Sequence, residues 1–471
     1  MHHSPQSIDA RYRSGNALRT AGDFAAAEAE FRGVLAQAPQ HRDAAYSLAF
    51  MLREQGRTDA AATVIAAWWQ VARPDAESAL AAVGFLIECA DYERALAVGR
   101  RARALWPDDA RLAARVGEAA LALGDFDEAR DALRVAVDSA PRLGNAWLRL
   151  AYCHRFAERD DADLARFRRA WRDTTLDTTA RLCAGFALGK ALDDLGDYAA
   201  AVDVLRPANL TAHAGAGWNR NAWQKFVDAR LVAERIPAQP ADDDFAPVFI
   251  VGLPRTGTTL VASGLARRTG VHDRGELNWI PGLYAHLREH AQLGNARALA
   301  TTATMVRAQM RRDDAPARFY LDKNPLNFRY VDFIVALFPN ARIVHCRRSP
   351  RDTALSLWMQ HFAHEDLGFS YAFADIAAVQ RGCATLMAHW RAAGIDIHDI
   401  DYEDLVADPG ARMHALASAL GMDSENTSQP APSAVATASV WQVRQPIYLR
   451  SVERWRGYAP YLAELEALFD A

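Results

Sequence analysis

The sequence predicts two structural regions, an all-α helical repeat region followed by an α/β domain built on a parallel sheet. Three observations lead to this prediction: a 34-residue repeat in the first half, an alternation of short apolar runs with helical stretches in the second, and a strand, glycine-rich turn and helix where the second half begins. We expect residues 1–235 to form the helical region, 236–246 a linker and 247–471 the α/β domain.

The first half repeats with a fixed period. Turn positions follow one another every 34 residues, at Gly22, Gly56, Ala90 and Gly124. Five residues after each turn stands an alanine, at Ala27, Ala61, Ala95 and Ala129. Such small residues let two antiparallel helices approach closely, and a glycine can end the first of them. A further unit begins at Gly196, which leaves a degenerate repeat at about 145–175. The pattern resembles tetratricopeptide repeats, which stack into a solenoid with a concave binding face.

The chain changes character after the repeats. Residues 236–244, IPAQPADDD, are short, acidic and contain two prolines, so we place the domain boundary there. Beyond it we expect strands at 248–251, 341–346 and 395–400. Helices are expected between and after them, at 260–268, 296–312, 331–337, 352–361 and 376–391. This alternation favours a parallel sheet covered by helices.

The turn after the first strand carries the clearest functional signal. Gly252 and Gly257 have the spacing of a Walker A loop, and the helix start that follows offers backbone N–H groups and a favourable dipole to a phosphate. Thr258, followed by Thr259, stands where a Walker A loop has its lysine, and the cation is instead Arg255 inside the loop. We therefore predict a P-loop-like site for a 5′-phosphate whose transferred group carries less charge than a γ-phosphate.

A second signal lies in residues 340–358, NARIVHCRRSPRDTALSLW. Arg347 and Arg348 follow an apolar strand at its carboxyl end, where ligands bind in open α/β sheets. A helix then carries Ser356, whose hydroxyl can join an arginine fork in holding a phosphate. Two phosphate sites at two strand ends indicate a ligand with two separate phosphates. The alternative is a solvated salt-bridge face.

From about Pro247 to Tyr461 the chain resembles the sulfotransferases that use 3′-phosphoadenosine 5′-phosphosulfate (PAPS). It is similar to the tyrosylprotein sulfotransferases and to bacterial proteins that join tetratricopeptide repeats to a sulfotransferase domain. The resemblance rests on 254–259 (PRTGTT), on the spacing of Arg348 and Ser356, and on 439–446 with 451–455. It implies that PAPS is the donor, 3′-phosphoadenosine 5′-phosphate the product, and that the following residues bind the nucleotide: Arg255, Thr256, Gly257, Thr258, Thr259, Arg348, Ser356, Ser439 and Arg454.

The resemblance also implies the catalytic residues, which are Glu276, Lys323 and Arg255. Glu276 would take the proton from the acceptor hydroxyl. Lys323, in Asp322-Lys323-Asn324-Pro325, would neutralise charge on the leaving group. Tyrosine-specific members have paired acids, whereas here Leu277 follows Glu276. The position of the catalytic base in the alignment could therefore shift by one residue. For both side chains the alternative is an ordinary surface position.

We therefore expect a PAPS-dependent sulfotransferase that transfers a sulfuryl group to a hydroxyl of a peptide, a protein tyrosine or a small compound. No metal is expected, because a sulfuryl group carries one negative charge fewer than a phosphoryl group. The enzymatic alternative is a P-loop kinase-like phosphotransferase, which would need a lysine at position 258 and Mg²⁺ ligands. The non-enzymatic alternative is a repeat scaffold with a nucleotide-binding domain. The repeats would bind the acceptor or a protein partner, or else only stabilise or dimerise the enzyme.

Composition limits the remaining classes. The 471 residues carry a net charge of −4, which gives no sign of nucleic-acid binding. No run of 18 apolar residues predicts a membrane span, and the N-terminus lacks the apolar core of a signal peptide, so we expect a cytoplasmic protein. The five cysteines show neither metal-ligand nor disulfide spacing.

Overall fold

The computed structural model describes residues 7–72, 74–242, 244–312, 317–362, 364–422 and 451–469. By their contacts these residues form two compact units. One comprises the described residues up to Arg149 together with 308–312, and the other begins at Leu150 and holds the rest. Ser439 and the expected loop at 424–438 lie outside the described residues. We treat each unit separately.

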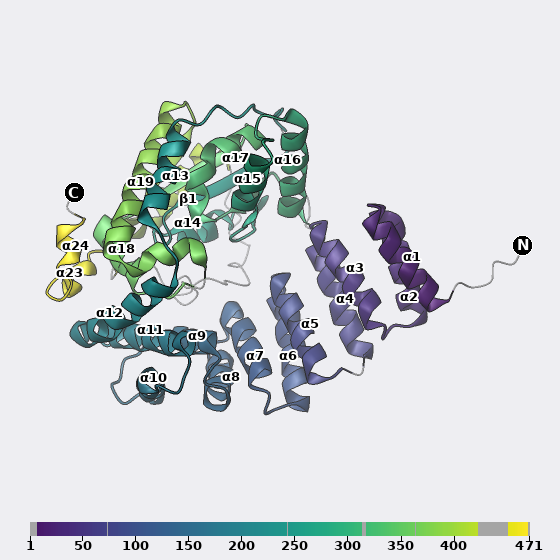
Figure 1. The fold of residues 1–471 in the computed structure, drawn as a ribbon, viewed down its shortest axis with the longest axis horizontal. Helices are drawn as coiled ribbons and strands as arrows, with labels where there is room; N and C mark the ends of the chain where they lie inside the picture. Colours follow the sequence, from purple (N-terminus) through teal and green to yellow (C-terminus); the bar gives the residue numbers. More distant parts are fainter. Residues whose placement is uncertain are drawn as a thin grey trace, which may run out of the picture. The chain divides into compact units, whose positions relative to one another are not determined.

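The first unit is made of paired antiparallel helices, visible as successive hairpins in Figure 1. Its helices are α1 (Ile8–Thr20), α2 (Phe24–Gln37), α3 (Arg42–Glu54), α4 (Thr58–Val71), α5 (Ala76–Glu88), α6 (Tyr92–Leu105), α7 (Ala110–Leu123) and α8 (Phe126–Ser139). All four predicted turn positions have left-handed backbone, with φ of +81°, +78°, +59° and +83° at Gly22, Gly56, Ala90 and Gly124. The residue after each turn position is the N-cap of the second helix of the pair, and Asp23, Asp91 and Asp125 cap that helix with a side-chain oxygen.

The second unit begins with the remaining helices of the helical region. These are the end of α9 (Gly144–Tyr152), α10 (Ala162–Arg172), α11 (Thr178–Asp194), α12 (Tyr198–Gly215) and α13 (Arg220–Leu231). The degenerate repeat corresponds to the short α9 and to α10. The expected linker, 236–246, lies between α13 and the first strand, whereas the division by contacts falls earlier, within α9.

Within the described residues the sheet has five parallel strands, β1 (Ala246–Gly252), β2 (Val271–Asp273), β3 (Phe319–Asp322), β4 (Arg342–Arg347) and β5 (Ile397–Asp401). Their order is β2-β3-β1-β4-β5, so β2 and β3 lie on one side of β1, with β3 next to it, and the chain then crosses to the other side. All seven residues of β1 are buried, as expected of a central parallel strand. This topology creates a switch point at the carboxyl end of β1, between β3 and β4.

Helices cover both faces of the sheet. On one face Val248 and Ile250 pack in an apolar core with α14 (Thr258–Leu265), α20 (Tyr402–Ala407) and α21 (Pro409–Ala419). On the other face, α13 runs along α19 in Figure 1. The remaining helices are α15 (Trp279–Glu289), α16 (Ala296–Arg311), η1 (Pro325–Tyr330), α17 (Val331–Leu337), α18 (Pro350–Trp358), η2 (Glu365–Tyr371), α19 (Phe373–Ala392), α23 (Trp455–Tyr458) and α24 (Glu464–Ala467).

The predicted strands and helices are confirmed, but the prediction omitted strands β2 and β3 and several helices, among them α15 and α21. β1, β4 and β5 and helices α14, α16, α17, α18 and α19 lie where the sequence placed strands and helices. Strands β2 and β3 were not predicted, because three and four residues are too short to show a period. Among the described residues, no helix is both long and apolar enough to cross a membrane.

The packing of the first unit predicts opposite effects of two glycine-to-alanine changes. A Cβ at Gly117 would lie 2.5 Å from Leu133 Cγ, whereas a Cβ at Gly84 would meet no atom within 4 Å. Both glycines lie inside helices, so Gly84→Ala should stabilise the protein by about 0.5–1 kcal/mol and Gly117→Ala should destabilise it by about 1–3 kcal/mol. Thermal midpoints of the two variants and wild type test this; a lower midpoint for both variants would contradict it.

Candidate functional site

The loop after β1 is shaped by two close approaches of the backbone. A Cβ at Gly252, whose φ is +140°, would lie 2.5 Å from the carbonyl oxygen of Cys346 on β4. One at Gly257, whose φ is +93°, would lie 2.6 Å from the Tyr402 ring. No side chain larger than hydrogen fits at either place. The loop therefore holds its N–H groups against the sheet edge, and Thr258 and Thr259 form the first turn of α14.

Arg255 lies inside this loop, and its side chain reaches α18, the helix that follows β4. Its φ is +74°, which is uncommon for a residue with a side chain. Its Nε donates a hydrogen bond of 3.1 Å to Ser356 Oγ on α18. Arg348 Nη1 in turn donates to the Arg255 carbonyl oxygen at 2.9 Å. The fold thus brings together Arg255, Arg348 and Ser356, three residues that the sequence assigned to two phosphate positions.

Arg348 is held by the backbone and by an aromatic ring. It lies at 4.7 Å from the Tyr402 ring centroid, and its Nη2 donates to the carbonyl oxygen of Ser451 at 2.5 Å. Its buried Nε has no hydrogen-bond partner among the described residues. Burial lowers the pKa of Arg348, because the charged form loses solvation. A buried guanidinium with a donor to spare is suited to an anion.

Arg454 completes a group of three guanidiniums. Burial is the main cause that lowers the pKa of Arg255, and repulsion from Arg348 and Arg454 adds to it. The chain next to Arg454 is fixed on α18, because Asp352 accepts hydrogen bonds from Glu453 N at 2.8 Å and Trp455 N at 3.0 Å. Arg454 itself forms an ion pair with Asp193 of α11. These contacts place three cations around the loop.

Glu276 and Lys323 follow β2 and β3. Lys323 Nζ lies 2.5 Å from Glu276 Oε1. The lysine side chain is only 4% exposed and the glutamate side chain 50% exposed, so the pair opens to solvent on the carboxylate side. The two side chains that the sequence assigned to catalysis are therefore neighbours at the same sheet edge.

Buried Asp322 fixes the segment that carries Glu276. Its Oδ1 accepts hydrogen bonds from Leu277 N at 3.2 Å and Asn324 N at 3.0 Å. Burial raises the pKa of Asp322 to about 7, more than these hydrogen bonds lower it. Asn324 Nδ2 adds a bond of 3.1 Å to the Leu277 carbonyl oxygen. The position of Glu276 thus depends on β3 and on the turn after it.

Several residues of the site were not found from the sequence. Tyr402 and Asp193 lie in no motif that we assigned to binding, and Asp352, although it lies within 340–358, was given no role there. The hydroxyl of Tyr152, in α9, donates to Gln360 Oε1 at 2.6 Å. Burial raises the pKa of Tyr152 to about 12, and the positive charge of Arg255 opposes that shift. The helical region thus reaches the neighbourhood of the loop.

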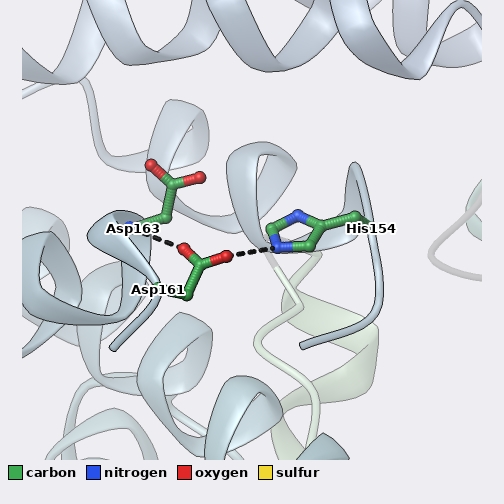
Figure 2. Close-up of side chains that lie close together, drawn as sticks. All are labelled: His154, Asp161 and Asp163. Atoms are coloured by element: carbon green, nitrogen blue, oxygen red, sulfur yellow. Dashed lines mark hydrogen bonds and ion pairs between the residues drawn. The ribbon is translucent and has the colours of Figure 1, made fainter. Parts of the chain in front are cut away.

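A second polar cluster lies apart from these motifs, at the start of α10. Figure 2 shows His154, Asp161 and Asp163, whose candidate ligand atoms lie within 4.8 Å of one another. Asp161 caps α10 through Asp163 N at 2.8 Å and contacts His154 Nε2 at 3.2 Å. Asp163 lies 3.3 Å from Arg166 Nη1. These contacts stabilise the N-terminus of α10, so we interpret the cluster as structural.

Comparisons with known proteins assign two parts of the chain to different families. Residues 247–426 match the sulfotransferase family. Residues 18–83, 90–144 and 117–173 match tetratricopeptide repeats. The chain thus contains tetratricopeptide repeats followed by a sulfotransferase-family domain. The matched domain includes Arg255, Glu276, Lys323, Arg348 and Ser356, whereas Arg454 lies beyond its end.

Individual relatives are distant. An uncharacterized protein of Aquifex aeolicus is 30% identical over 312 residues, which cover 60% of this chain and 40% of that protein. Protein-tyrosine sulfotransferase 2 of Gallus gallus is 22% identical over 240 residues, covering 45% of this chain and 64% of its own. The chain thus spans less than two thirds of either relative. A solved sulfotransferase of Mycobacterium tuberculosis is 16% identical, with 66% of this chain and 94% of that chain covered and a TM-score of 0.28.

The buried Asp322 predicts an unusual dependence of stability on pH. A carboxyl whose pKa is raised in the folded state stabilises the fold while protonated, and this stabilisation is lost as pH rises from about 4 to about 7. Asp322→Asn removes this dependence, and the amide can still accept from Leu277 N. The thermal midpoint of the variant should therefore rise relative to wild type between pH 5.5 and pH 7, by the equivalent of about 2 kcal/mol.

Asp131→Asn is the control, because that side chain is 80% exposed and its ion-pair partner is an arginine, which keeps its charge over this range. Its midpoint relative to wild type should stay nearly constant over the same range. If Asp322→Asn behaves in the same way, the carboxyl of Asp322 titrates normally in the folded protein.

Proposed function

We propose that this protein is a sulfotransferase that transfers a sulfuryl group from PAPS to a hydroxyl of an acceptor. The observation that carries the proposal is the constellation of Arg255, Arg348 and Ser356 at the switch point of the sheet. Three guanidiniums gathered at one place, of which Arg454 is ion-paired with Asp193, suit a ligand with several negative charges. The match to the sulfotransferase family includes Arg255, Arg348 and Ser356, and it supports a sulfuryl donor as the anionic ligand.

The chain's residues divide between the two ends of the donor. The N–H groups at the start of α14, with Arg255, Thr256, Gly257, Thr258 and Thr259, would hold the 5′-phosphosulfate. Arg348 would hold the 3′-phosphate through its spare Nε, and Ser356 through its hydroxyl. Arg454 would close the site from the C-terminal side. Ser439 remains a further proposed contact. No metal is required by this arrangement, because arginine and lysine supply the positive charge.

Glu276 and Lys323 would carry the transfer itself. The acceptor oxygen forms a bond to sulfur while the bond from sulfur to the bridging oxygen breaks, and that electron pair goes to the departing 3′,5′-diphosphate. Glu276 accepts the acceptor's proton. Lys323 balances the charge that develops on the leaving oxygen. Because the two side chains form an ion pair, both must exchange partners when substrates bind.

The acceptor is proposed to be a hydroxyl of a peptide or protein, with tyrosine as the first candidate. The similarity of this chain to a protein-tyrosine sulfotransferase supports a phenolic hydroxyl as the acceptor group. The repeats offer a surface for a larger acceptor or a protein partner. A small hydroxyl compound could be sulfated by the same chemistry. The alternative role of the repeats is to form a homodimer. Transfer of labelled sulfate from PAPS into a lysate, followed by identification of the product, tests the proposal directly.

Arg348→Ala should weaken binding of adenosine 3′,5′-diphosphate by about 2–3 kcal/mol, since hydrogen bonds to charged groups have this strength. Discrimination against the 5′-phosphate alone should collapse as well. Arg347→Ala is the matched control, because this adjacent arginine forms ion pairs with Asp399 and Asp401 instead. Calorimetric titration of both variants with the diphosphate tests the assignment. It would be refuted if both variants lost the same affinity, or if the Arg348 variant still preferred the diphosphate as strongly as wild type does.

Glu276→Gln should lower kcat by about 10²–10⁴-fold, the usual contribution of a general base, while nucleotide affinity changes little. The loss should shrink for nitrophenol acceptors, which need less help in losing a proton. Lys323→Ala should lose activity equally on acidic and ordinary acceptors, because the leaving group is unchanged. If Glu276→Gln keeps kcat within about threefold of wild type, the base lies elsewhere, and Asp273 and His272 are the next residues to test.

A further inference from the structure

A carboxylate of the helical region binds Arg454, one of the residues of the proposed nucleotide site. Asp193 is near the last residue of α11, in the final clear repeat of the chain. Its Oδ2 forms an ion pair with Arg454, and its Oδ1 accepts a hydrogen bond of 2.6 Å from the Tyr458 hydroxyl. The Asp193 side chain is 11% exposed, so the pair is largely shielded from water. Both oxygens are therefore used by the C-terminal segment.

The contact is firmly supported on the C-terminal side. Tyr458 is fully buried, and its ring centroid lies 4.7 Å from that of Tyr198, the first residue of α12. A Cβ at Gly457 would come within 2.7 Å of the same Tyr198 ring, so the segment packs against α12 without space to spare. The segment that carries Tyr458 and binds the carboxylate of Asp193 is therefore held in place by packing.

Arg454 needs this carboxylate for an electrostatic reason. Arg255 and Arg348 lie close enough to repel it, as the lowered pKa of Arg255 reflects after the larger effect of burial. Burial also acts to lower the pKa of Arg454, but attraction to Asp193 outweighs it and the pKa is raised. Without Asp193 the guanidinium would gain solvation and escape repulsion by turning away from the other two.

The backbone and the side chain of Arg454 are held by different residues. Asp352 binds the N–H groups of Glu453 and Trp455 and so determines where the backbone lies. Asp193 binds the guanidinium and determines where it points. A change at Asp193 should therefore release the side chain while the segment stays docked on α18.

We propose that Asp193 is a positioning residue that holds Arg454 toward the nucleotide site, so that the helical region takes part in binding the sulfuryl donor. The inference rests on the proposed function, in which Arg454 contacts the nucleotide. It goes beyond it by giving the last repeat a role in donor binding rather than only in acceptor recognition or stability.

The test uses the full chain and adenosine 3′,5′-diphosphate as probe, titrated by calorimetry. Asp193→Asn should weaken binding by about 2–160-fold, the range for contacting residues in one network. Arg454→Ala should weaken it at least as much. The double variant should be no weaker than Arg454→Ala alone, because Asp193 acts only through that side chain.

Two matched variants separate positioning from support of the segment. Arg206 of α12 forms an ion pair with Glu464, so Arg206→Gln breaks another contact between α12 and the C-terminal segment without touching Arg454. Tyr458→Phe removes the other hydrogen bond of Asp193. Both should bind the diphosphate within about twofold of wild type, well inside one 1.4 kcal/mol step, whatever their thermal midpoints. Should Asp193→Asn fail to fold, Asp193→Glu keeps the charge but displaces it, and it should weaken binding in the same direction.

The outcomes are distinct. If wild type does not bind the diphosphate, both the proposed function and this inference fail. If wild type binds it but Asp193→Asn binds equally well or more tightly, only the positioning role is wrong. Losses that add in the double variant, or that Arg206→Gln reproduces, would likewise overturn it.

Discussion

The site depends on the parallel alignment of the strands. Because all strands of the sheet point the same way, the segments that follow β1, β2, β3 and β4 meet at one edge, although 93 residues separate Arg255 from Arg348. The order β2-β3-β1-β4-β5 adds a crevice at the carboxyl end of β1. The close approaches of Gly252 to β4 and of Gly257 to Tyr402 then bring the loop down onto this edge.

Like charges gathered in one place need compensation, and neutral acceptors supply part of it. Arg348 is bound by two carbonyl oxygens and the Tyr402 ring, Arg255 donates to a serine hydroxyl, and Arg454 is bound by the carboxylate of Asp193. Neutral acceptors hold a guanidinium in place without cancelling its charge. The site thus keeps a positive potential that an anionic ligand can neutralise.

The helical region has two different parts. In the first unit, repeated glycine or alanine turns and aspartate caps build regular helix pairs. In the second, α9, α11 and α12 supply Tyr152, Asp193 and Tyr198, whose contacts are with the sulfotransferase-family domain or its C-terminal segment. The family boundary in the sequence therefore differs from the boundary in packing, because helices of one repeat type can pack on a sheet as well as on another repeat.

The sequence by itself determined what local chemistry controls. The 34-residue period, the left-handed turns, the glycine-bounded loop and the three longer strands follow from backbone geometry and short-range patterns, and these were predicted from residues such as Gly124, Gly252 and Gly257. Only the tertiary structure decided which charges meet. The pairing of Lys323 with Glu276, the burial that raises the pKa of Asp322, and the contact of Asp193 with Arg454 link residues 47 to 261 positions apart or arise from surrounding atoms. Contacts between residues far apart in the chain, and the desolvation of a side chain, are not encoded in a short sequence pattern. No motif could therefore reveal these three features.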